Sequence, residues 1–314
     1  MCMNTNITEN LENAENAGGA KCFGYPVKVI TKDDYPLLLK TIGKLPARMY
    51  VCGDIPDDDH KFLCVIGSRN NSEYGRQVCK DIIFGLQGAP VVIISGLAIG
   101  IDSLAHEFAI EAGLKTVAIP GSGLDRSVMY PSSRRELAKK ILDSGGAIVS
   151  PFEMKQSGAR WTFPVRNSIM AGMSHAVLMI EAREKSGTLI TAGNALDFNR
   201  DLLAVPGSIF SDLSKGTNQQ LRSGATAVTC ALDVLEALGI SRGESSEIQT
   251  KFNLDRLGPD EARLLSRLSY PKLRDELINE LHIDASDLNA LLSSLELVGA
   301  ISEEDGLIMK IWRT

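Results

Sequence analysis

The 314-residue sequence lacks the patterns that most metal and redox sites require. Its six cysteines form no C-x-x-C pair, and its four histidines do not cluster. This argues against zinc or a redox dithiol and favours reduced thiols. No Ser–His–Asp order and no paired carboxylates stand out either. We therefore predict no catalytic residues, no metal site and no cofactor, so the chain is not expected to be an enzyme.

Long apolar runs and aromatic side chains are also scarce. No stretch approaches the roughly 18 apolar residues of a membrane span. The polar, acidic start lacks the basic segment and apolar core of a signal peptide. Aromatic residues make up 5% of the chain and hydrophobic residues 44%, which indicates an aliphatic core. We predict a cytoplasmic protein that does not contact membranes, with residues 1–22 as a disordered tail.

Positive charge is limited as well. The formal net charge is −6, and only the middle of the chain is not acidic: residues 61–240 carry 18 Lys and Arg against 16 Asp and Glu. This balance argues against a general polyanion binder. An anionic partner would need a local basic site within residues 61–240.

Apolar runs alternate with helical patterns along residues 61–240. In one such pattern, Ile101, Leu104, Ala105 and Phe108 fall on one helix face. Strands that alternate with helices predict right-handed crossovers and an α/β fold with a doubly wound, mostly parallel sheet. The predicted strands are 62–67, 91–95, 115–119, 146–150, 175–182, 201–207 and 225–228.

The flanking segments complete the predicted domain organisation. Residues 23–60 read as a short N-terminal lead-in, and residues 241–256 as a polar linker. In residues 257–314, helical patterns at 259–268, 272–281 and 285–297 precede a hairpin with its turn near Glu304–Gly306. This predicts a small C-terminal winged-helix domain. The third helical pattern contains no Lys or Arg, which favours a protein-contact or regulatory role over DNA reading.

Two arginines follow a possible helix cap. Ser133 and Glu136 match the S-x-x-E capping box, which places Arg134 and Arg135 in a first helical turn. A cation there is disfavoured by about 0.3–1 kcal/mol. The two arginines either point to solvent and pair with acids such as Glu136, or they face a bound anion.

Arginines at two further loops favour the anion. Pro164 marks a helix start with Arg166 and Asn167 just inside it. Arg69 directly follows a predicted strand. Because ligands collect at the carboxyl ends of parallel strands, three such loops together favour phosphate binding.

Two glycine turns remain ambiguous. In VIISGLAIGIDSLAH (92–106), Gly96 and Gly100 have neither dinucleotide-binding nor P-loop spacing. They either bind an oxyanion through backbone amides or allow close packing. The same alternatives hold for SGTLITAG, where Ser186 is a possible N-cap. Asp102 and His106 form either a dyad or, in the simpler interpretation, a dipole partner and a packed histidine.

Six ordered motifs carry a family resemblance. They are GSR-x-x-S-x-YG (67–75), SGLAIGID-x-x-AH (95–106), G-x-GLD-x-x-x-x-YP (121–131), FP-x-RN (163–167), EA-x-x-x-SGTLITA-x-x-A (181–195) and AVPG (204–207). Together they resemble the DprA/Smf family. The resemblance implies an extended Rossmann-like fold that binds single-stranded DNA and forms a homodimer. It also implies loading of a RecA-type recombinase during natural transformation.

The resemblance, with the loops above, indicates a set of phosphate- and DNA-binding residues, in which Phe163 or Tyr130 offers a stacking face. The set is Gly67, Ser68, Arg69, Ser95, Gly96, Gly121, Tyr130, Arg134, Phe163, Arg166, Asn167, Ser186, Gly187 and Thr188. One departure is Ser168, where the family often has a basic residue.

An alternative is a nucleotide-binding enzyme similar to the phosphoribohydrolases. Their motif is PGG-x-GT-x-x-E, and its glutamate takes part in cleaving the N-glycosidic bond. This chain has SGTLITA, with no glutamate three residues after Thr188. The motif therefore counts against this alternative.

Overall fold

The computed structural model describes residues 16–240, 258–268, 270–297, 300–304 and 306–310. The chain divides into two compact units, residues 1–248 and 249–314. The predicted linker, residues 241–256, lies outside the described residues.

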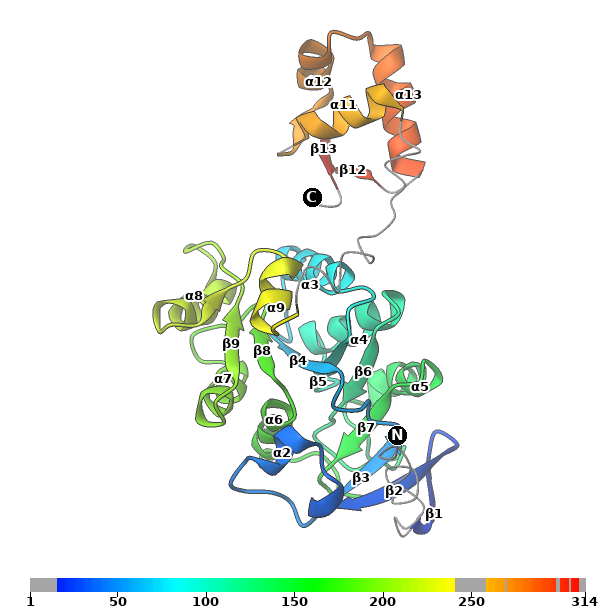
Figure 1. Ribbon diagram of the computed structural model, residues 1–314, viewed down its shortest axis with the longest axis vertical. Helices are drawn as coiled ribbons and strands as arrows, with labels where there is room; N and C mark the ends of the chain where they lie inside the picture. Colours follow the sequence, from blue (N-terminus) through cyan, green and yellow to red (C-terminus); the bar gives the residue numbers. More distant parts are fainter. Residues whose placement is uncertain (1–15, 241–257, 269, 298–299, 305, 311–314) are drawn as a thin grey trace, which may run out of the picture. The chain divides into compact units, whose positions relative to one another are not determined.

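The described part of the first unit is built on a ten-stranded sheet of order β1-β2-β3-β7-β6-β5-β4-β8-β9-β10 (Figure 1). The seven strands from β4 to β10 pair in parallel with one another. They correspond to the seven predicted strands, and the predicted α/β class is confirmed. Their bounds are β4 (Lys61–Ile66), β5 (Val91–Ser95), β6 (Lys115–Ala118), β7 (Ala147–Ser150), β8 (Ala176–Met179), β9 (Asp201–Ala204) and β10 (Thr226–Ala227).

Helices cover both faces of this sheet because the strand side chains alternate. Leu63 and Val65 of β4 pack in one core with α3, α4 and α9, while Phe62 and Cys64 pack in another with α2, α6 and α7. Both faces of the strands are therefore apolar, as parallel strands require. The helices are α2 (Leu37–Lys40), α3 (Glu73–Gly85), α4 (Ile101–Glu111), α5 (Arg135–Asp143), α6 (Thr162–Gly172), α7 (Thr188–Asp197), α8 (Lys215–Arg222) and α9 (Ala231–Ala237).

The N-terminal segment, predicted as a short lead-in, is part of the main sheet. Strands β1 (Asn16–Cys22), β2 (Tyr25–Thr31) and β3 (Arg48–Gly53) join the main sheet, because β3 pairs antiparallel with β7. Strand β1 takes up the last seven residues of the predicted disordered tail, so the prediction is wrong for residues 16–22. The reason is burial: Cys22 of β1 packs in one core with Val27 and Cys52, and Met49 and Val51 of β3 lie in the same core as Phe62.

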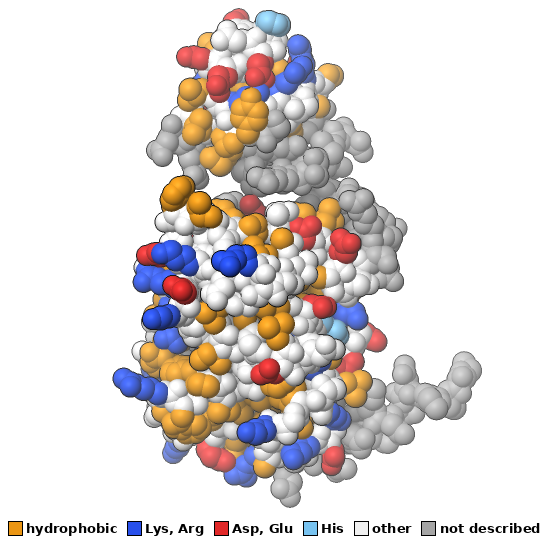
Figure 2. Space-filling model, turned by 90° about the vertical axis from the view of Figure 1, so that its left-hand side faces the viewer, with side chains coloured by type: hydrophobic (Ala, Val, Ile, Leu, Met, Phe, Trp, Pro, Cys, Tyr) orange, Lys and Arg blue, Asp and Glu red, His pale blue; other side chains and the backbone are white. Residues whose placement is uncertain are grey.

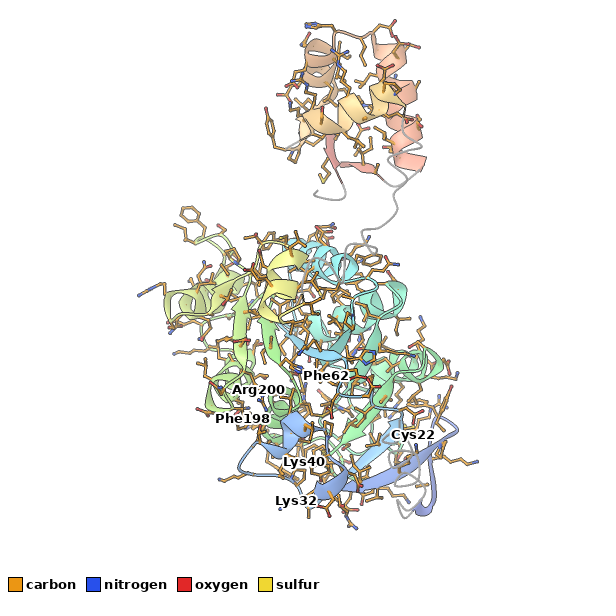
Figure 3. All side chains as sticks on the ribbon, viewed as in Figure 1. Cys22, Lys32, Lys40, Phe62, Phe198 and Arg200 are labelled. Carbon is orange, nitrogen blue, oxygen red and sulfur yellow. The ribbon has the colours of Figure 1, made fainter. Side chains whose placement is uncertain are left out.

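Arg200 provides a second attachment of this segment (Figure 3). It lies in the turn between α7 and β9, and its Nη2 donates to Leu38 O at 2.7 Å, Thr41 Oγ1 at 2.8 Å and Gly172 O at 3.1 Å. One guanidinium group thus joins the α2 region to the end of α6.

The second unit is a winged-helix domain, as predicted. Helices α11 (Pro259–Arg267), α12 (Arg274–Leu281) and α13 (Ala285–Leu297) pack over a three-stranded sheet of order β11-β13-β12. Strands β12 (Ile301–Glu304) and β13 (Leu307–Lys310) form the predicted hairpin, and β11 is Lys272–Leu273. Helix α13 carries no Lys or Arg. Lys272 and Arg274 are held by Glu280 and Glu303.

Two negative findings concern the described ranges only. None of their helices is both long and apolar enough to pass through a membrane. Within the same ranges, His, Cys, Asp and Glu side chains do not gather in threes as metal ligands would.

The attachment of β3 can be tested by truncating its core. Met49 is fully buried. Met49→Ala should therefore lower the free energy of unfolding of the first unit by about 2–5 kcal/mol, measured by urea denaturation. Leu37→Ala, at a position 62% exposed in the same segment, should change it by less than about 0.5 kcal/mol. Equal small effects would show that the segment is not part of the main core.

Candidate nucleic-acid interface

The predicted loops meet at one edge of the sheet, where the parallel strands end. Ile101 N donates to Ser68 O at 3.1 Å, and Thr188 Oγ1 donates to Gly67 O at 3.2 Å. These bonds connect the loop after β4 with the start of α4 and with the start of α7. The edge is therefore one connected structure, as ligand sites of open parallel sheets are.

The glycines of this edge allow close packing. A Cβ added to Gly96 would lie 1.2 Å from Nη1 of Arg166, and one added to Gly121 would lie 2.7 Å from the ring of Phe163. Gly100 has φ +87°, and a Cβ there would lie 2.3 Å from Ser68 O. Of the two alternatives for Gly96 and Gly100, the contacts therefore favour close packing.

Arg166 is buried beneath the edge and pairs with a buried acid. Its side chain is 5% exposed, and its Nη1 lies 3.4 Å from Oδ2 of Asp102, whose side chain is 10% exposed. Burial lowers the pKa of Arg166 and raises the pKa of Asp102, and each partner's charge opposes the other's shift. Arg166 is therefore placed to hold α6 against α4, in contrast to the expected contact with a phosphate.

Asp102 and His106 do not form a dyad. Nδ1 of His106 lies 2.7 Å from Thr116 Oγ1, and its side chain is fully buried. Burial lowers the pKa of His106 to about 3, so the ring is neutral at physiological pH. The simpler interpretation of His106 as a packed histidine fits this structure.

The exposed features of the edge are a cation and aromatic rings. Arg69 is exposed, and its Cζ lies 5.4 Å from the centroid of the Phe163 ring. Tyr130, 47% exposed, packs edge-on against Phe163 at 5.8 Å. Among the described residues, no carboxylate lies within ion-pair distance of Arg69. This arrangement leaves a guanidinium and ring faces available to a ligand.

The sequence patterns did not identify Trp161 as a site residue. It is 57% exposed and packs edge-on against Phe152 at 5.6 Å, next to the start of α6. Its only sequence signal is its position two residues before the FP-x-RN motif. Together with the exposed Tyr130 and the partly buried Phe163, it makes a third aromatic ring in the part of the edge that follows β6 and β7.

The predicted capping box at Ser133 does not form. Residues Ser132–Arg134 make a 3-10 turn, and α5 starts at Arg135 without a side-chain cap. Arg135 Nη2 donates to Ser127 O at 2.9 Å, and Nη1 of Arg134 lies 4.0 Å from Glu107. Glu136 faces Arg126 instead of either arginine. The tight turn directs Arg134 toward α4, where it lies near Arg69.

Several of the remaining predicted residues lie in or beside turns and strands of this edge. Ser186 is not the N-cap of α7 as predicted: the N-cap is Gly187, which faces open space, and the bond that Ser186 Oγ accepts from Thr188 N at 3.2 Å belongs to the turn before the helix. Ser95 is buried and donates to Val65 O at 2.7 Å. Asn167 is half-buried on α6. Gly187 therefore does not serve close packing, in contrast to Gly96 and Gly100.

Glu181 was also missed, and it organises the edge. This buried carboxylate accepts bonds from Ser72 N and Ser72 Oγ, at the N-cap of α3. A Cβ at Gly75 would lie 2.3 Å from its Oε2. Glu181 thus joins the end of β8 to the start of α3, and its oxygens are not directed toward a substrate.

Lys and Arg are scattered elsewhere on the first unit. On the face shown in Figure 2, basic side chains of described residues lie among acidic and hydrophobic ones, without a continuous basic stripe. On this face, the positive charge available to a polyanion is therefore local. The negative net charge of the chain leads to the same expectation.

Known proteins resemble this chain in both units. It matches the family model described as DNA recombination-mediator protein A over residues 27–239 and the DprA winged helix domain model over residues 250–306. It is 36% identical over 211 residues to the DNA processing protein DprA of Streptococcus pneumoniae, which covers 67% of this chain and 73% of that protein.

Two solved structures share its fold. The X-ray structure of DNA processing protein A from Streptococcus pneumoniae superimposes with a TM-score of 0.63 and 32% identity, covering 73% of this chain and 77% of that one. DNA processing protein A from Helicobacter pylori, described for its single-stranded DNA binding mode, superimposes with a TM-score of 0.61 over 69% of this chain and 98% of that one. At 24% identity, the second likeness shows the fold alone.

The buried pair can be tested by a double-mutant cycle. Asp102→Asn leaves the guanidinium of Arg166 buried without a counter-charge, and should lower the free energy of unfolding by about 3–5 kcal/mol. The double variant Asp102→Asn/Arg166→Met should lose less stability than Asp102→Asn and Arg166→Met lose in sum. The difference should be about 0.5–3 kcal/mol, which is the usual coupling energy of residues in contact. Additive losses would contradict the pairing.

The buried neutral His106 predicts a pH dependence. Because its folded pKa of about 3 lies below the ordinary 6.5, unfolding takes up a proton between these values, and stability falls as the pH falls from 6.5 toward 3. The slope for the native protein should exceed that of His106→Asn by up to about 1.4 kcal/mol per pH unit. Equal slopes in urea titrations would refute the assignment.

Proposed function

We propose, since the chain belongs to the DNA recombination-mediator protein A family, that its sheet edge binds single-stranded DNA for recombination. The observation that carries the proposal is Arg69. It is an exposed guanidinium that has no ion-pair partner among the described residues and lies 5.4 Å from an aromatic ring. A cation beside ring faces suits a polymer in which phosphates alternate with bases.

Each part of the edge has a chemical counterpart in a single strand. Arg69 neutralises a phosphate, which supplies most of the affinity and makes it depend on salt. Phe163, Tyr130 and Trp161 offer surfaces on which bases stack, worth about 1–3 kcal/mol for each base. Stacking does not distinguish bases strongly, so the binding is expected to tolerate any sequence. Arg166 acts as a positioning residue because it is buried.

The protein acts by binding and not by catalysis. The phosphoribohydrolase alternative requires a free glutamate near the phosphate loop. In this chain no glutamate follows Thr188 at the required spacing, and the buried Glu181 is engaged by Ser72. No observation favours this alternative.

The proposal also covers the oligomeric state and the protein partners of the chain. We expect the chain to act as a homodimer in the cytoplasm and to deliver DNA to a RecA-type recombinase in natural transformation. The winged-helix unit is proposed as a protein-contacting module because α13 carries no Lys or Arg. Light scattering of the full chain tests the dimer. Co-precipitation with the host recombinase, with and without residues 241–314, tests the contact.

Removing the exposed cation tests the DNA site. Arg69→Ala should weaken binding to oligo-dT roughly 10- to 100-fold by fluorescence anisotropy, which corresponds to about 1.5–3 kcal/mol for a charged hydrogen bond. The fold should persist because Arg69 is exposed. Arg222→Ala removes an equal charge from the exposed last turn of α8 and should leave the affinity unchanged. Equal affinities for both variants would contradict the site.

A further inference from the structure

A basic hollow is lined by Arg69, and Phe163 is not among its lining residues. It is a cavity of about 200 Å³ between the start of α3, the first turns of α4 and the turn at Ser132–Arg134. Figure 1 shows α3 and α4 running alongside each other on one face of the sheet. Arg69, Arg76 and Arg134 reach this hollow from three different elements, and Glu107 is the carboxylate that lines it.

The three guanidinium groups are poorly neutralised. Arg69 has no ion-pair partner among the described residues. Nη1 of Arg134 lies at the limit of an ion pair, 4.0 Å from Glu107, and its Nε is buried without a hydrogen-bond partner in the described part of the chain. Arg76 is held over the ring of Phe108 at 5.6 Å. Its distance to Glu73 is 3.7 Å.

Such a cluster carries an energetic cost unless an anion joins it. Like charges gathered around a small cavity repel one another, and Glu107 in the lining and Glu73 beside Arg76 set two carboxylates against three guanidinium groups. The floor of the hollow is the N-terminal part of α4, whose dipole adds positive potential. Arginines in a fork geometry, supported by asparagine amides from Asn70 and Asn71, suit the oxygens of a phosphate.

We propose that this hollow binds a second phosphate group of the same single strand, adjacent to the phosphate at Arg69. Arg69 both contacts the Phe163 ring and lines the hollow, so a strand bound at Arg69 can run from the aromatic rings toward α4. The inference rests on the proposed DNA binding and adds to it a direction for the strand, a position for the predicted contact Arg134 and one further contact, Arg76.

The test compares salt dependence among variants of the full chain. The logarithm of the oligo-dT affinity should fall with the logarithm of salt concentration less steeply in Arg134→Ala than in the native protein, by about 0.7 for one lost phosphate contact. Arg76→Ala should change the slope in the same direction. Arg126→Ala removes a charge from the same loop, where it faces Glu136, and should keep the native slope.

The outcomes separate the two proposals. If the native protein binds oligo-dT but Arg134→Ala and Arg76→Ala retain its slope, the hollow does not bind a backbone phosphate and the inference is overturned. If the native protein does not bind oligo-dT, the proposed function itself fails. The variants should lower the salt slope equally for oligo-dT with a 5′-hydroxyl and for oligo-dT with a 5′-phosphate. A change confined to the 5′-phosphorylated strand would assign the hollow to a terminal phosphate and overturn the internal contact.

Discussion

The sheet edge that we propose as the DNA site depends on one buried interaction, the pair formed by Arg166 and Asp102. Arg166 comes from α6 and Asp102 from α4, and these helices pack on opposite faces of the sheet. The pair therefore joins the two helix layers just beyond the end of β5. Gly96 leaves space for the guanidinium, which a side chain would overlap. Phe163 lies one helical turn before Arg166, so the pair also sets the position of the ring that faces Arg69.

Buried and exposed arginines thus have different roles at this edge. A buried charge is stabilised by its partner and resists removal, but it is not available to a ligand. Arg69 and Arg134 have the opposite properties: they are partly or fully exposed and weakly paired. A protein with a net charge of −6 can bind a polyanion in this way, because a few unpaired cations at one edge act over about a Debye length.

Local sequence patterns predicted the elements of the fold but not its long-range contacts. Alternating apolar runs located the strands from β4 to β10, and the helical periodicity located α11, α12 and α13 closely. The pairing of β3 with β7 joins segments about a hundred residues apart, and β1 is rich in Gly and Ala without alternation, so neither had a local signal. The family motifs identified loops that meet at one edge of the sheet. They did not show that Arg166 would be buried against Asp102, 64 positions away, or that Glu181 would cap α3 from 109 positions away.

The central claim is that single-stranded DNA lies along the aromatic and arginine edge of the first unit. The most direct measurement is photo-crosslinking of oligo-dT that carries 5-iodouracil to the full chain, with the adducts located by mass spectrometry. The account predicts adducts at Tyr130, Phe163 and Trp161, whose rings line this edge. Adducts confined to the winged-helix unit, where Tyr270 is 61% exposed beside Lys272, would contradict it.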